Sequence, residues 1–375
     1  PSRDPDRVAW PTVGGPPDPG GTPPSWATPS VDTLSVPDYM ASAAVLGAGG
    51  YLGGELLRLL SNHPSLTVTS AVSSTHAGKR VGEVYPNLDG FSDVVLSSDA
   101  SKIDADLAFL AQPAGEAMRS VPGLLERGIR AVDLGPDYRM PDPKEYERVY
   151  GRPHEDAGHL SQAVYGLPEI FRDEVRSARL VANPGCYPTA ALLAIAPLLE
   201  RGPIAGPVIV DAKSGTSGAG HDPTPSTHHP EAALTVWPYG APEHRHLPEM
   251  RAALARTGRT SPPIVFVPHL VPLVRGILCS VYPTGLSGDP SEWTRIFEER
   301  YEDSPFVRVG AVPRLPWAHG TNRCYLSVQR AGDAPVVFSA IDNLGKGGAA
   351  QAIQNANLLL GLPETAGLDR PGYAV

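Results

Sequence analysis

The stretch ASAAVLGAGGYLGGELLRLLSNHP, residues 41–64, decides the fold class of this chain. Its first part is a short apolar run typical of a buried strand, and its second part repeats leucines at helical spacing until Pro64 ends the pattern. Between the two parts, Gly47, Gly50 and Gly53 have the spacing G-x-x-G-x-x-G. Glycines in such a turn let the backbone approach a pyrophosphate, which the free N–H groups at the helix start can bind. The stretch therefore predicts a dinucleotide-binding loop; the alternative is a glycine-rich turn that serves packing alone.

The segments that follow alternate between strand and helix patterns. LTVTSAV (66–72), ADLAFLAQ (105–112) and IRAVDLG (129–135) are typical of strands, whereas GEAMRSVPGLLERG (115–128) is typical of a helix. This alternation predicts a parallel sheet with helices on its faces. We therefore expect an α/β Rossmann dinucleotide-binding domain over residues 40–185.

The pattern changes after residue 186, where strand-like runs surround one helix pattern. The strand-like segments are GPVIVDAKSG (206–215), PPIVFVPHLVPLVRGILCSVYPTG (262–285), which is long enough for two strands, and CYLSVQRAG (324–332). The helix pattern covers residues 291–305. These segments predict an α+β second domain over residues 186–337, and we expect a terminal helix at residues 346–361.

Composition and charge exclude several classes of protein. Of the 375 residues, 41% are hydrophobic and 19% are charged, which suits a globular protein with a sizeable core. No apolar run approaches the roughly 18 residues that span a bilayer, and a net charge of −9 argues against general nucleic-acid binding. Cys186, Cys279 and Cys324 are too widely spaced for a disulfide framework or a zinc motif. We expect a cytoplasmic protein that contacts neither membranes nor nucleic acid.

The first 39 residues have a different composition from the rest. Residues 1–39 contain ten prolines and four glycines with little periodicity. Such a composition favours disorder because it lacks the apolar side chains that form a core. We therefore expect a disordered, dispensable tail.

The end of the second predicted strand indicates which dinucleotide binds. A Rossmann site for NAD usually carries an acidic residue there, which binds the ribose hydroxyls. This chain has Ser73, Ser74 and Thr75 instead, with Lys79 and Arg80 close behind. Hydroxyl groups and cations suit a 2′-phosphate, so the sequence favours NADP; the alternative is a solvated loop without a cofactor contact.

Cys186 lies at the entrance of a predicted helix, in NPGCYPTAALLAIAPLLE (183–200). Pro188 suits the first turn of a helix, where a missing N–H costs little. The positive end of the helix dipole stabilises a thiolate, and cysteines at such positions often have a lowered pKa. We therefore interpret Cys186 as a nucleophile; a buried structural cysteine is the alternative.

Two histidines, His244 and His246, supply an acid–base partner for this thiol in the segment APEHRHLPEM (241–250). If this segment is extended, their side chains share one face and Arg245 points to the other. A zinc site with the upstream histidines is a further alternative, as is a loop of surface histidines. The upstream histidines are His221, His228 and His229. Their irregular spacing, without a cysteine, argues against zinc, so we expect no metal.

Blocks over residues 41–368 resemble the N-acetyl-γ-glutamyl-phosphate reductase family, in the order of that family. The blocks are GAGGYLGGE, VYGLPE, ARLVANPGCYPTAALLAIAPLLERG, VDAKSGTSGAG, HRHLPEM, VPHLVPLVRGIL and SAIDNLGKGGAAQAIQNANLLLGLPE. The resemblance implies a Rossmann domain and an α+β catalytic and oligomerisation domain of the glyceraldehyde-3-phosphate dehydrogenase type, in a homodimer or homotetramer. It also implies that the terminal helix packs back on the Rossmann domain.

The same resemblance assigns roles to single residues. It implies that Cys186 is the nucleophile and His246 the acid–base. It also implies that Lys346 lies near the nicotinamide. The expected cofactor-binding residues are Gly47, Gly50, Tyr51, Leu52, Gly53, Ser73, Ser74, Ser214, Gly215 and Asn343. The expected substrate-binding residues are His244, Arg245, Glu249 and Lys213, and a structural ion pair is the alternative for Lys213.

The implied activity is NADPH-dependent reduction of N-acetyl-γ-glutamyl phosphate to the semialdehyde, with release of phosphate, through a cysteine thioester. One alternative keeps this chemistry on a carrier-bound α-aminoadipate phosphate, and another is a side-branch enzyme for a related acyl phosphate. The segment DLGPDYR (133–139), where the family has DLSADFR, leaves room for such a relative. A cysteine hydrolase without a cofactor and a regulator that senses NADP are the remaining alternatives.

Overall fold

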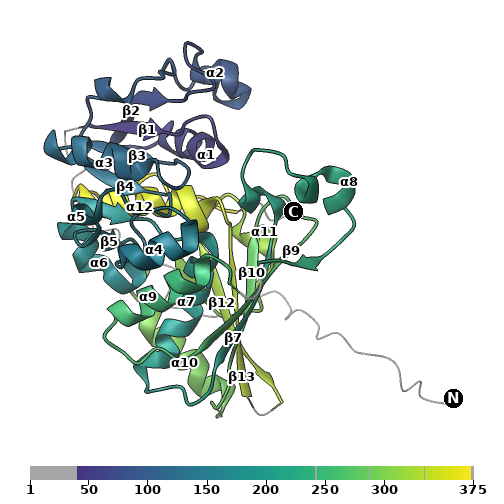
Figure 1. Cartoon of the computed structure of the whole chain (residues 1–375). Helices are drawn as coiled ribbons and strands as arrows, with labels where there is room; N and C mark the ends of the chain where they lie inside the picture. The colour runs from purple at the N-terminus through teal and green to yellow at the C-terminus, as the bar shows by residue number, and fades with distance from the viewer. Residues whose placement is uncertain (1–39, 241–242, 287, 333, 373–375) are drawn as a thin grey trace, which may run out of the picture. The chain divides into compact units, whose positions relative to one another are not determined.

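The computed structural model describes residues 40–240, 243–286, 288–332 and 334–372 of the chain. The predicted tail, residues 1–39, lies outside the described residues. Two sheets organise the described chain (Figure 1).

The first sheet has six parallel strands in the order β2-β1-β3-β4-β6-β5. The strands are β1 Ala41–Leu46, β2 Leu66–Val72, β3 Leu107–Leu110, β4 Arg130–Asp133, β5 Val164–Tyr165 and β6 Leu180–Ala182. Successive residues of β1 pack into different hydrophobic clusters. Val45 packs with helices α1 and α12, and Leu46 packs with α3. These helices are α1 Tyr51–Leu60, α3 Ala117–Glu126 and α12 Ala350–Leu359. Helices on both faces explain why β3 and β6 in the sheet are apolar and buried at every position, and the predicted α/β Rossmann fold is confirmed.

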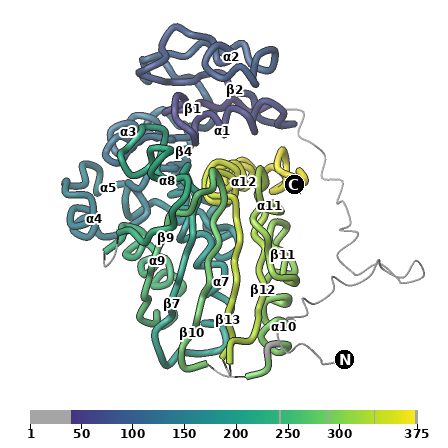
Figure 2. Tube along the Cα trace, turned by 90° about the vertical axis from the view of Figure 1, so that its right-hand side faces the viewer, coloured from purple at the N-terminus to yellow at the C-terminus, as the bar shows by residue number. Residues whose placement is uncertain are grey.

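The second sheet has seven strands of mixed direction in the order β11-β12-β13-β10-β7-β9-β8, and Figure 2 shows its central strands side by side. The strands are β7 Val208–Ser214, β8 Trp237–Pro238, β9 Ile264–Leu270, β10 Ile277–Pro283, β11 Val307–Val309, β12 Cys324–Ala331 and β13 Ala334–Ile341. The long predicted segment at 262–285 does hold two strands, β9 and β10. The predicted α+β second domain is therefore confirmed.

Three helices cover one face of this second sheet (Figure 1). They are α7 Cys186–Glu200, α9 His246–Arg256 and α10 Pro290–Tyr301. Residues 187–199 of α7 are all buried, which explains why this helix is apolar on every side. Shorter helices complete the described chain: α2 Val81–Val84, α4 Pro143–Tyr150, α5 Ala157–Leu160, α6 Pro168–Ser177, α8 His229–Ala232 and α11 Leu315–Ala318. No helix of the described residues is long and apolar enough to cross a membrane.

The C-terminal segment returns to the six-stranded sheet, where α12 packs between β4, α1 and α6. The predicted helix at 346–361 differs at its start, because residues Gly345–Ala349 form a π-helical turn, η6, before α12 begins. The N–H groups of Gly347 and Ala349 reach carbonyls five residues back, each at 2.8 Å. A π-turn of this kind is rare and is frequently found at functional sites.

Candidate active site

The glycine loop between β1 and α1 can be formed by glycine alone at two positions. Gly47 has a φ of +77°, and a Cβ there would lie 2.2 Å from the carbonyl oxygen of Ala111. A Cβ on Gly53 would lie 2.3 Å from the carbonyl oxygen of Gly47. Gly50, the N-cap of α1, provides no side-chain cap. The first-turn N–H groups of α1 therefore remain available to a pyrophosphate, so this loop fits a dinucleotide.

Side chains from outside the loop hold it in place. The hydroxyl of Tyr85 donates to the carbonyl oxygens of Ala48 and Gly50, at 2.9 and 3.2 Å.

Tyr51, the first residue of α1, is 44% exposed, and its ring lies edge-on to the ring of His221 at 5.2 Å. Because His221 belongs to the chain after β7, the second domain reaches the cofactor helix at this point.

The predicted ribose-binding residues lie directly after β2. Ser73 is buried, and its hydroxyl accepts the backbone N–H of His76 at 3.3 Å. Ser74 is exposed, as are Lys79 and Arg80. This loop therefore presents a hydroxyl group and two cations to solvent, and its Ser73 hydroxyl lies beside Gly49 of the glycine loop.

Asn343 shapes the loop that follows β7. Its amide oxygen accepts the N–H of Gly276 at 2.7 Å, and its amide nitrogen donates to the hydroxyl of Ser217 at 2.9 Å. Ser214 is buried in the same region, and a Cβ on Gly215 would come 2.8 Å from the backbone nitrogen of Arg275. Asn343, Ser214 and Gly215 thus lie in one region, where the Asn343 amide makes hydrogen bonds to protein groups.

Two lysines have partners within the protein. The ammonium group of Lys213 lies 2.5 Å from a carboxylate oxygen of Asp211. The ammonium group of Lys346 is buried and donates to Glu169 and Gln354, at 2.6 and 2.7 Å. Lys346 therefore closes an internal network with Glu169 and Gln354.

Cys186 is the first residue of α7, after Gly185 as the N-cap. Its side chain is half-buried. Burial raises the pKa of the Cys186 thiol above its ordinary value, while Arg139, the backbone N–H of Tyr187 and Arg245 act in the opposite direction. The helix-start position predicted from sequence is confirmed, but the lowered pKa expected there is not found. The thiol therefore needs a base.

His246 is the first residue of α9, so the expectation of an extended segment at HRHLPE is wrong. The backbone N–H of His246 donates to Nδ1 of His244 at 3.1 Å, and the two rings lie 4.9 Å apart. Burial is the largest of the causes that lower the pKa of His246 well below its ordinary value, and burial lowers that of His244 to about 4. Both imidazoles are therefore neutral at pH 7. Nδ1 of His246 is buried and has no hydrogen-bond partner among the residues that the structure describes.

Gly185 connects the nucleophile with the histidine. A Cβ on Gly185 would lie 2.7 Å from Nε2 of His246 and 3.0 Å from Nη1 of Arg139. The imidazole therefore lies against the residue that precedes Cys186. The backbone N–H of Gly185 donates to Glu249 at 2.8 Å. Glu249, expected to bind substrate, is buried and bound to the loop before Cys186 instead.

Arg139 also belongs to this site, although its sequence pattern alone assigns it no role. It is buried, and its guanidinium donates to the carbonyl oxygens of Asn183 and Leu134, at 2.9 and 2.7 Å. The sequence does contain a signal that Arg139 could lie at a site. It is the last residue of the segment DLGPDYR, which follows a predicted strand, and ligand sites of parallel sheets lie at the carboxyl ends of strands.

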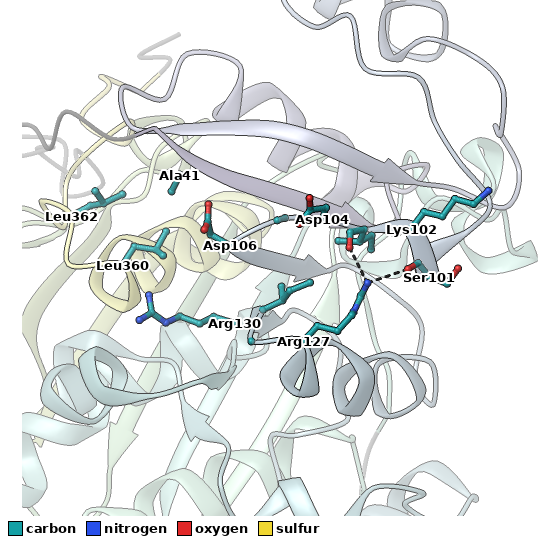
Figure 3. Close-up of a pocket in the computed structure, with 13 residues that line it drawn as sticks. Ala41, Ser101, Lys102, Asp104, Asp106, Arg127, Arg130, Leu360 and Leu362 are labelled. Atoms are coloured by element: carbon teal, nitrogen blue, oxygen red, sulfur yellow. Dashed lines mark hydrogen bonds between the residues drawn. The ribbon is translucent and has the colours of Figure 1, made fainter.

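A cavity of about 810 Å³ lies elsewhere in the fold (Figure 3). Its lining includes Ala41, Asp106 and Arg130, from the amino ends of β1, β3 and β4. Arg127 borders it and donates to the carbonyl oxygens of Ser101 and Ile103. This is the sheet edge opposite to the glycine loop, and none of the predicted site residues lines it. Across the described ranges, no group of three or more His, Cys, Asp or Glu side chains is placed to hold a metal ion.

Comparison with known proteins agrees with this geometry. Residues 42–178 match the family described as semialdehyde dehydrogenase, NAD binding domain, and residues 186–343 match semialdehyde dehydrogenase, dimerisation domain. A curated N-acetyl-gamma-glutamyl-phosphate reductase of Methanopyrus kandleri is 48% identical over 344 residues, which cover 89% of this chain and 99% of the relative. The chain belongs to this reductase family. A second member, from Moorella thermoacetica, is 42% identical over 344 residues, with coverages of 89% and 99%.

Solved structures show the same fold at lower identity. Aspartate semialdehyde dehydrogenase II of Vibrio cholerae superposes with a TM-score of 0.66 at 17% identity, over 86% of this chain and 98% of that chain. The aspartate semialdehyde dehydrogenase of Candida albicans, solved with NADP, has a TM-score of 0.59 at 17% identity, with coverages of 86% and 98%. As a family member the protein is an oxidoreductase that uses a nicotinamide dinucleotide. The predictions of fold, family and enzyme class are confirmed.

Proposed function

We propose that this protein reduces N-acetyl-γ-glutamyl phosphate to N-acetylglutamate semialdehyde with release of phosphate, using NADPH. Relatives of that name, similar over nearly their whole length, support the substrate. The observation that supports the chemistry is the packing of the neutral His246 imidazole against Gly185, the residue that precedes Cys186 at the start of α7.

The first half of the reaction uses the thiol and the imidazole. Neutral His246 accepts the proton of Cys186, and the thiolate attacks the acyl carbon of the substrate. The C–S bond forms, the C–O bond to phosphate breaks, and phosphate leaves and takes a proton from water. The first-turn N–H groups of α7 stabilise the oxyanion of the tetrahedral adduct, because Gly185 leaves them uncapped.

The second half releases the aldehyde. A bound nicotinamide dinucleotide supplies the hydride that reduces the thioester. His246, now protonated, gives its proton to the oxygen of the thiohemiacetal. It removes that proton again as the C–S bond breaks, and it passes the proton to the departing sulfur, which restores the thiol and the neutral imidazole.

The anionic substrate requires cations near Cys186. Arg245 is exposed and close enough to the thiol to lower its pKa, and we assign it to an anionic group of the substrate. His244 lies beside His246, and we assign it to substrate binding as well. Lys213 is bound to Asp211 and has a structural role in this proposal.

Two finer points belong to the same proposal. The cofactor is NADPH rather than NADH, because Ser73, Ser74, Lys79 and Arg80 occupy the region where an NAD site has an acid. The protein forms a homodimer or homotetramer through its second domain, which matches a dimerisation domain.

The reverse reaction tests the proposed function. The enzyme is mixed with N-acetylglutamate semialdehyde, NADP and phosphate, and the absorbance of NADPH is followed. We expect phosphate-dependent formation of NADPH. Activity confined to the one-carbon-longer semialdehyde, free or bound to its carrier protein, would reject the substrate while keeping the chemistry.

A further inference from the structure

The first turn of α9 contacts the loop before Cys186 with two side chains. The ring of His246 lies against Gly185, and a carboxylate oxygen of Glu249 accepts the Gly185 N–H at 2.8 Å. His246 and Glu249 are three residues apart in the same helix, so their side chains share one face. The turn that carries the proposed base is thus fixed to the residue before the nucleophile.

The charge of Glu249 is balanced inside the protein. Nη1 of Arg139 lies 3.3 Å from its second carboxylate oxygen, and the two side chains are 9% and 2% exposed. The hydroxyl of Tyr165 donates to the first oxygen at 2.8 Å. Both oxygens of Glu249 are therefore engaged by protein groups. A buried carboxylate needs such partners because removing one leaves an uncompensated charge.

Arg139 connects this carboxylate to the six-stranded sheet. Its guanidinium also donates to the carbonyl oxygen of Leu134, directly after β4, and to that of Asn183, two residues before Gly185. Asn183 is held independently, since its side chain accepts from Asn355 at 3.0 Å and its N–H donates to the carbonyl oxygen of Asp133 at 2.8 Å. The loop before Cys186 is therefore held at Asn183 by hydrogen bonds with Arg139, Asn355 and the backbone of Asp133.

We propose that Arg139 and Glu249 are positioning residues, which clamp the Gly185 amide between the end of β4 and the first turn of α9 and so fix Cys186 relative to His246. This inference rests on the proposed roles of Cys186 and His246. It removes Glu249 from the substrate-binding set, because its oxygens already bind Gly185, Tyr165 and Arg139.

The clamp also sets the electrostatic surroundings of the thiol. Burial raises the pKa of Cys186, Arg139 lowers it and Glu249 raises it. Loss of the Glu249 charge should therefore lower the pH at which the thiol ionises, and loss of the Arg139 charge should raise it. A purely structural pair would not give these opposite shifts.

The experiment compares Glu249→Gln, Arg139→Met and Arg139→Lys with the wild-type enzyme. The rate of alkylation of Cys186 by iodoacetamide is measured against pH, with peptide mapping, beside kcat, KM and melting temperature. We expect Glu249→Gln to lower kcat by about 10- to 100-fold, since small misplacements cost that much, with KM changed less than about threefold. Its alkylation midpoint should move to lower pH, that of Arg139→Met to higher pH, and Arg139→Lys should restore part of the shift.

Glu364→Gln serves as the matched control, because Glu364 pairs with Arg172 in another partly buried ion pair. We expect it to change melting temperature but neither kcat nor the alkylation profile. A raised KM for Glu249→Gln with an unchanged alkylation profile would show a substrate ligand and overturn the inference. Profiles and kcat like those of Glu364→Gln would overturn it too. A wild-type enzyme whose Cys186 resists alkylation would overturn the proposed function and the inference with it.

Discussion

Gly347 lies directly against Cys186: a Cβ on Gly347 would come 2.7 Å from the Cβ of Cys186 and 3.1 Å from its Cα. The next residue, Gly348, lies in the same way against Leu52 of the cofactor helix, where a Cβ would come 2.5 Å from Cδ2. Both glycines belong to the π-turn η6. The π-turn η6 therefore separates the proposed nucleophile from the cofactor helix α1. A side chain at Gly347 or Gly348 would push Cys186 and Leu52 further apart.

Gly347→Ala should damage catalysis more than folding. The new methyl group would meet backbone and Cβ atoms, which cannot rotate away, so Cys186 or η6 must shift. We expect kcat to fall at least about 10-fold and stability to fall by about 1–3 kcal/mol, as for overpacked cores. Gly123→Ala, an exposed site in α3 with nothing near its Cβ, is the control and should be neutral or slightly stabilising. Wild-type kcat in Gly347→Ala would show that the contact is not needed.

The cofactor preference should depend on the loop after β2. Lys79→Ala combined with Arg80→Ala should reduce the ratio of kcat/KM for NADPH over NADH by about 10-fold or more, because each ion pair with a 2′-phosphate contributes a kcal/mol or so. Activity with NADH should change little. Steady-state kinetics with both cofactors measures this, and an unchanged ratio would place the 2′-phosphate elsewhere.

His244 should contribute to the acid sensitivity of the fold. Its pKa is about 4 in the folded protein, against an ordinary value near 6.5. Between about pH 6.5 and pH 4, His244 is therefore protonated in the unfolded chain but neutral in the folded protein. The free energy of unfolding falls as the pH drops through this window. Between pH 7.5 and 5.0, this histidine alone should cost up to about 2 kcal/mol.

His244→Asn removes this proton-binding difference. The loss of unfolding free energy between pH 7.5 and 5.0 should be smaller than in the wild-type enzyme by up to about 2 kcal/mol. Urea unfolding at both pH values measures it. Equal losses in the two proteins would mean that His244 titrates normally in the folded state.

Local patterns predicted the first domain because its elements are set by neighbours in sequence. The apolar run before Gly47 forms β1, and the leucine spacing after Gly50 forms α1. The position of Cys186 at a helix start is predictable for the same reason, since Pro188 marks that start two residues later.

Local patterns do not predict contacts between segments that are far apart in the sequence. Arg139 and Glu249 are 110 residues apart, and nothing near either of them in the sequence indicates the other. The alternation in HRHLPE suggests an extended segment, but α9 begins at His246, and Pro248 is compatible with this start because the first turn of a helix tolerates proline. The π-turn before α12 was missed as well, since its fit depends on contacts with Cys186 and Leu52.

Acylation of Cys186 tests the central claim most directly. The enzyme is mixed with N-acetyl-γ-glutamyl phosphate without a cofactor, quenched in acid and mapped by peptide mass spectrometry, beside Cys186→Ser. The account predicts an N-acetylglutamyl thioester on the peptide that contains Cys186, which disappears when NADPH is added. It also predicts that Cys186→Ser forms no adduct while binding NADPH normally. A wild-type enzyme that turns over without this adduct, or a Cys186→Ser enzyme that keeps more than about a hundredth of the activity, would contradict it.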